Sequence, residues 1–181
     1  MLDAFHVVKL ATQVVDDVRR RVQQETTGQR GRRDDPLYRV RNILRAGEEH
    51  LTDRQRARIA SAFTAREEHL EVEVAWRCAQ QVRSAYHQDT HAAGRGVAEK
   101  ILAALASCPI PEVARLGKTL RQWRVAYLGY FDTNGASNGG FEAVNGPHRT
   151  PPPHRPRPAQ PRELPAADAP HRRWAKQALR L

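Results

Sequence analysis

Apolar residues recur over the first 130 residues at the spacing that places them on one face of an α-helix. The opening stretch predicts the end of a strand near Asp3 and then a helix to about Gln24. Five further segments show the same pattern, with proline, glycine or capping residues at their ends. They predict helices over about 36–46, 53–63, 68–87, 90–107 and 112–130. The expected body is therefore mainly α-helical, with no strand predicted beyond the opening one.

Short motifs mark several of these helix ends. Asp35-Pro36 combines a capping carboxylate with a proline at the first helical position. Thr52-Asp53-Arg54-Gln55 has the spacing of a capping box, and Cys108-Pro109-Ile110-Pro111 stops the helix before it. Trp76 and Trp123 both fall on apolar faces, so we expect both in the core.

The chain changes character after Gly146. Nine of its twelve prolines lie between Pro147 and Leu181, among scattered arginines and histidines. Such a segment buries too little apolar surface to offset its ordering entropy, and we expect it to be disordered. With permissive codons, the neighbouring reading frame of residues 147–158 encodes an amphipathic string, which predicts that the tail is a frameshift product. The predicted organisation is one domain over residues 2–146 and a tail over 147–181.

The balance of charge favours a polyanion as partner. The formal net charge is +10 and the isoelectric point is about 10.5, and nucleic acid is the commonest polyanion that such proteins bind. Solvated surface charge is the alternative interpretation of each basic cluster. The candidates for contact with DNA phosphates are Arg19 on the first helix and the loop residues Arg30, Arg32 and Arg33.

The patterns of cysteine, histidine and hydropathy bear on metal binding, cellular compartment and membrane insertion. Cys78 and Cys108 are thirty residues apart without CxxC spacing, which fits a reducing compartment and indicates no metal site. His87 and His91 lack a third ligand at suitable spacing, so surface histidines are the preferred interpretation. No apolar run has the length of a membrane span, and the start lacks a signal-peptide pattern. We expect a cytoplasmic protein that does not enter a membrane.

Five short stretches, taken in order, resemble one known family. They are the segment Asp3 to Ala11, Asp34-Asp35-Pro36-Leu37-Tyr38, Cys108-Pro109-Ile110-Pro111-Glu112, Leu128-Gly129-Tyr130-Phe131-Asp132 and Asn138-Gly139-Gly140-Phe141-Glu142. Each is weak alone, but the ordered set over residues 2–146 resembles the ISL-three family of DDE transposases from bacterial insertion sequences.

The resemblance gives two carboxylates a catalytic and metal-binding role. Three carboxylates act together in that family; the match places the second on Asp3 and the third on Glu142, whereas the first would lie upstream of Met1. Such carboxylates hold Mg²⁺ for phosphoryl transfer on DNA. From the residues alone, Asp3 also reads as a turn or capping residue. Glu142 likewise reads as an ordinary first-turn glutamate after the Gly139-Gly140 turn.

Together these observations predict a truncated transposase. Its helices look like the insertion that such enzymes carry, attached to a remnant of an RNase H-like fold. DNA is the expected partner, and the resemblance implies homo-oligomers in the intact family. Because the first carboxylate is missing, we expect weak or absent Mg²⁺ binding and no catalysis. The competing interpretation is a non-catalytic basic helical protein that binds nucleic acid or caps a partner.

Overall fold

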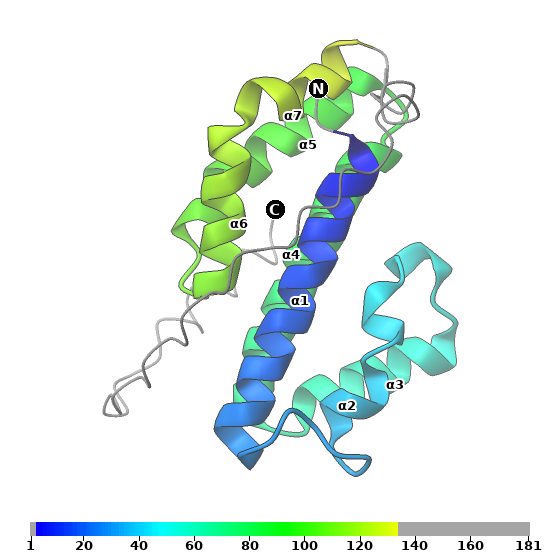
Figure 1. Ribbon diagram of the computed structural model, residues 1–181. Coiled ribbons are helices and arrows are strands. Elements are labelled where there is room, and N and C mark those ends of the chain that lie inside the picture. The colour runs from blue at the N-terminus through cyan, green and yellow to red at the C-terminus, as the bar shows by residue number, and fades with distance from the viewer. Residues whose placement is uncertain (1–2, 134–181) are drawn as a thin grey trace, which may run out of the picture.

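The computed structural model describes residues 3–133, and these residues form a helical array without a strand (Figure 1). The mainly α-helical body is thus confirmed, whereas the opening strand, the Asn138–Glu142 stretch and the tail over 147–181 lie outside the described residues. The helices are α1 (Ala4–Thr27), α2 (Pro36–Val40), α3 (Asp53–Thr64), α4 (Leu70–Ser84), α5 (His91–Ala104), α6 (Pro111–Gln122) and α7 (Arg124–Asp132). Short 3-10 turns connect several of them.

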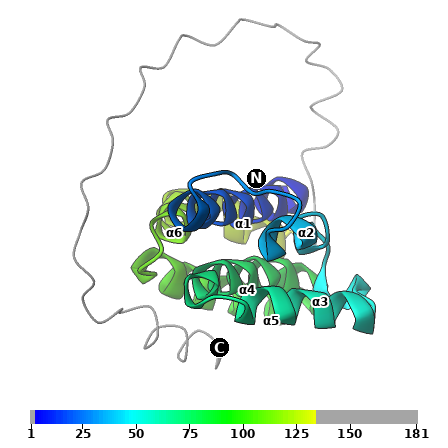
Figure 2. The same cartoon turned by 90° about the horizontal axis from the view of Figure 1, so that it is seen from below.

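The core lies between two layers of helices. Figure 2 shows α1, α2 and α6 in one layer and α3, α4 and α5 in the other, and α1 packs along α4. Buried residues on α1 recur every three or four positions, as its sequence pattern predicts. These residues are Val7, Ala11, Val15, Val18 and Val22. Their counterparts on α4 include Val72, Ala75, Trp76, Ala79 and Val82.

Capping chemistry confirms the predicted starts of α2 and α3, but the helix predicted over 36–46 ends at Val40 and is followed by a 3-10 turn over Ile43–Arg45. The Asp35 carboxylate accepts hydrogen bonds from the backbone N–H groups of Leu37 and Tyr38, and Pro36 opens α2. Thr52 and Gln55 form the complete capping box of α3. α1 ends at Thr27, where Gly28 takes the left-handed conformation with φ 69°. Local side-chain chemistry therefore determines where these helices begin and end.

The last predicted helix is wrong in one respect, because it is broken at Trp123. The backbone there has φ −99° and ψ 22°, so the chain turns between α6 and α7. The turn lets α7 pack against α5 and bury Tyr127, Leu128 and Phe131. Trp123 is left at the corner and is 43% exposed, which corrects its predicted core position. Trp76, in contrast, is buried as predicted.

A polar cluster joins three helices inside this array. Arg21 on α1 donates hydrogen bonds to Glu71 on α4 at 2.6 Å and to Glu112 on α6 at 2.8 Å. Burial by itself lowers the pKa of Arg21, but the hydrogen bonds to Glu112 and Glu71 outweigh it and raise the pKa well above its ordinary value. The guanidinium of Arg21 therefore keeps its charge, and its hydrogen bonds hold α1 against both neighbours.

None of the helices within residues 3–133 has the length and apolar character needed to cross a bilayer. Both cysteines are buried and free.

Candidate catalytic edge and nucleic-acid interface

Asp3 caps the first helix. One oxygen of its carboxylate accepts a hydrogen bond from the backbone N–H of Phe5 at 3.3 Å, and the other lies 3.4 Å from Nδ1 of His6. A carboxylate at this position satisfies a free backbone donor and interacts favourably with the helix dipole. The Asp3 side chain keeps 31% of its surface exposed. Capping thus accounts for its local geometry, while solvent still reaches the carboxylate.

An aromatic cluster lies beside Asp3. Tyr86 follows α4, and its ring centroid lies 5.1 Å from that of Tyr130 and 5.3 Å from that of Phe131, both on α7. Burial raises the pKa of Tyr86 far above its ordinary value, and the neighbouring Tyr127, Tyr130 and Asp3 raise it further. The last turn of α7 therefore packs on Tyr86, and Asp3 lies within electrostatic reach of the Tyr86 phenol.

Arg19 does not reach the surface, contrary to the sequence prediction. It is 4% exposed, and its guanidinium donates to Asp16 at 3.3 Å and to Gln23 at 2.5 Å. Gln23 in turn donates to Asp35 at 2.8 Å, which connects α1 to the cap of α2. Because protein groups surround this guanidinium, it cannot contact a DNA phosphate in this conformation. Its role here is structural.

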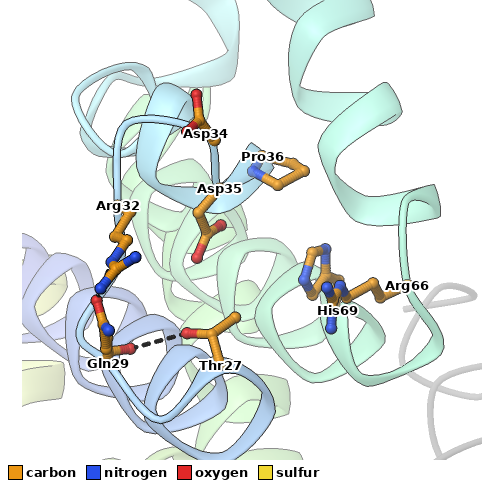
Figure 3. A pocket seen from close by; sticks show the side chains of 8 residues that line it. All are labelled: Thr27, Gln29, Arg32, Asp34, Asp35, Pro36, Arg66 and His69. Carbon is orange, nitrogen blue, oxygen red and sulfur yellow. Dashed lines mark hydrogen bonds between the residues drawn. The ribbon is translucent and has the colours of Figure 1, made fainter.

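The other three predicted arginines lie together in the loop between α1 and α2. Arg30, Arg32 and Arg33 are all exposed. Arg32 donates to Gln29 and lines a hollow of about 300 Å³ (Figure 3). Two arginines and two aspartates line this hollow, so their formal charges cancel. The loop arginines remain candidates for phosphate contact, but the hollow itself has little attraction for an anion.

Sequence reasoning missed three arginines on the adjoining helices. Arg39 on α2 and Arg54 and Arg58 on α3 are exposed and line a common groove. The sequence could have predicted part of this surface, because Arg54 and Arg58 are four residues apart on one helix and must share a face.

Metal-ligand side chains do not converge within residues 3–133. No group of three histidine, cysteine, aspartate or glutamate side chains there is placed to hold an ion. His87 and His91 are exposed, and His91 stacks near Tyr130 with ring centroids 6.3 Å apart. Glu142, the other candidate ligand, lies outside the described residues.

Comparison with known proteins gives the class of protein. A family model described as transposase, of the DDE type, matches residues 1–150. This is most of the 181-residue chain, and the chain therefore belongs to the ISL-three family of DDE transposases. Searches of curated proteins and of solved structures found no match.

Proposed function

We propose that residues 2–146 form part of the catalytic domain of a DDE transposase, and that most of it is the helical insertion between the second and third carboxylates. In this proposal Asp3 is the second carboxylate and Glu142 is the third. A remnant of an RNase H-like fold would flank the array. The observation that carries the proposal is the packing of the last turn of α7 on Tyr86, whose phenol also lies within electrostatic reach of Asp3.

This arrangement matters because an insertion has to return the chain to the site that it leaves. Glu142 is nine residues beyond Thr133, the last described residue. Nine residues span at most about 30 Å when fully extended, so a chain leaving α7 can bring Glu142 back to Asp3. The hydroxyl of Tyr86 is also buried, without a hydrogen-bond partner among the described residues. An unpaired donor at this point favours an acceptor from the returning chain.

Asp3 suits one position of a divalent metal site. Carboxylate oxygens are the ligands that Mg²⁺ prefers, and the Asp3 side chain is partly open to solvent. The described residues do not complete such a site. A bound divalent ion would stabilise charge on the phosphoryl group being transferred. The resemblance assigns only two of the three family carboxylates to these 181 residues, and we propose that the protein they form does not cleave DNA.

Two assays test this proposal on the purified protein. Incubation with Mg²⁺ and supercoiled DNA should give neither nicking nor strand transfer. Metal-dependent cleavage that disappears in Glu142→Gln would overturn the proposed inactivity.

Duplex DNA binding should be weak, independent of sequence, and steeply reduced by salt. Deleting residues 147–181 removes a net charge of +6 and should flatten the salt dependence. An unchanged dependence would show that the tail contributes nothing to binding. Absence of any DNA binding would contradict the proposed function itself.

A further inference from the structure

We infer that the groove between α2 and α3 is a binding site for the sugar-phosphate backbone of duplex DNA, with Arg39, Arg54 and Arg58 as its phosphate contacts. The inference rests on the proposed function, in which DNA is the substrate, and it assigns the contact to a surface that the sequence did not single out. The groove has a volume of about 450 Å³. It lies at the α2–α3 end of the array, away from α6 (Figures 1 and 2).

Charge distinguishes this groove from its neighbours. Three arginines line it and no carboxylate does. Four other hollows on the described part of the chain each include at least one aspartate or glutamate. A carboxylate in the wall repels a phosphate and pairs with the cation that would bind it. The α2–α3 groove is therefore the most attractive of these five hollows for a polyanion.

The three arginines also keep N–H groups for a ligand, although Arg39 donates through Nε to the backbone oxygen of Arg33 at 3.0 Å. Arg54 and Arg58 are exposed and lie one turn apart on α3, about 6 Å between Cβ atoms. Arg58 donates to the backbone oxygen of Arg39 at 3.2 Å, which holds its guanidinium at the groove and leaves its other N–H groups available. Arg39 has one acidic neighbour, Asp34, at 3.7 Å, but that side chain is 94% exposed. Such an exposed pair contributes little and yields readily to a phosphate.

The shape of the groove suits a backbone. Ala57 and Ser61 on α3 and Ala65 at its C-cap recur every four residues and are all exposed. Small side chains at this spacing form a shallow floor between the arginines, so that a sugar-phosphate chain can approach the helix closely. The Ser61 hydroxyl adds a hydrogen-bond donor, a group that often contacts DNA phosphates. Recognition through phosphates carries no sequence information, which agrees with the sequence-independent binding proposed above.

The test compares variants with equal charge and different positions. In the full 181-residue protein, Arg54→Gln/Arg58→Gln should weaken duplex binding by on the order of tenfold per arginine at low salt. The same variant should reduce the slope of log K against log salt by roughly 2. The matched control is Arg115→Gln/Arg124→Gln, which removes two exposed arginines from α6 and α7. It should change the slope by much less. Equal losses in both variants would show a diffuse charge effect and overturn the inference.

A second variant tests the groove without changing charge. Ser61→Trp should obstruct the floor and weaken binding, whereas Ala92→Trp on the exposed first turn of α5 should not. Circular dichroism and thermal melts confirm that each variant is folded. Poly-L-glutamate that competes as well as duplex DNA at equal charge would overturn a DNA backbone as the ligand. If wild-type protein binds DNA but Arg54→Gln/Arg58→Gln and Ser61→Trp bind it equally well, the groove assignment fails and the proposed function stands.

Discussion

Replacing each of two helical glycines, Gly96 and Gly117, with alanine should change the free energy of unfolding in opposite directions. Gly117 on α6 is buried against the 3-10 turn Leu105–Ser107. A Cβ at this position would lie 2.3 Å from the backbone N of Ala106 and 2.5 Å from the backbone C of Leu105. Gly96 on α5 is exposed, and a Cβ there would meet nothing within 4 Å. The two positions thus separate helix propensity from packing.

The magnitudes follow from these contacts. Alanine gains about 1 kcal/mol over glycine in a helix interior, so Gly96→Ala should raise the free energy of unfolding by up to about that amount. Inserting a methyl group into a packed interface costs about 1–3 kcal/mol. The obstructing atoms at Gly117 are backbone atoms that cannot rotate away, which favours the upper end of this range. Gly117→Ala should therefore lower the free energy of unfolding by about 2 kcal/mol.

Urea unfolding followed by circular dichroism measures both variants. Their free energies of unfolding should differ by about 3 kcal/mol, since both variants gain helix propensity and only Gly117→Ala introduces a steric overlap. If Gly117→Ala is as stable as Gly96→Ala, α6 does not approach the Leu105–Ser107 turn as closely as described, and the packing argument is refuted.

Further predictions concern the polar cluster and the thiols. Arg21→Met leaves Glu112 in the interior without its cation and should lower the free energy of unfolding by about 2–3 kcal/mol, less than for a fully buried pair because the Arg21 side chain is 26% exposed. The control Arg20→Met should change that free energy by no more than about 0.5 kcal/mol. Equal effects of the two variants in urea titrations would contradict this account. Native protein at neutral pH should react with a thiol reagent only in denaturant, because Cys78 and Cys108 are buried. Burial raises the pKa of Cys108 from 9.0 to about 11, so the unfolded thiol loses its proton first and stability should fall as the pH rises from about 9 to 11. Cys108→Ala should reduce that alkaline loss in a pH series of urea titrations, and an unchanged loss would argue against the buried thiol.

The sequence predicted those features that depend on neighbouring residues. Asp35-Pro36 and the Thr52 box mark helix starts because their hydrogen bonds close within three residues. The break at Trp123 escaped prediction because apolar periodicity is the same on both sides of it. Arg19 was misplaced because its burial depends on Asp16 and Gln23, which satisfy its guanidinium on the inner face of α1.

In the candidate site, too, local sequence predicted some features and others depend on tertiary packing. Family motifs made Asp3 a candidate, but its electrostatic interaction with Tyr86 is a tertiary property that no local spacing encodes. The shared face of Arg54 and Arg58 could be read from their spacing, whereas the groove that includes Arg39 depends on how α2 packs against α3.

The central claim is that the helical array returns Glu142 to Asp3, and a distance measurement tests it most directly. Spin labels on Asp3→Cys and Glu142→Cys can be compared by pulsed EPR with labels on Asp3→Cys and Gln24→Cys, which lie about 30 Å apart along α1. Two metals of such a site lie about 4 Å apart, so their carboxylates must be close. The account predicts a distance between labels at residues 3 and 142 that is under about 20 Å once label arms are included. A distribution centred at or beyond that of the α1 pair would contradict it.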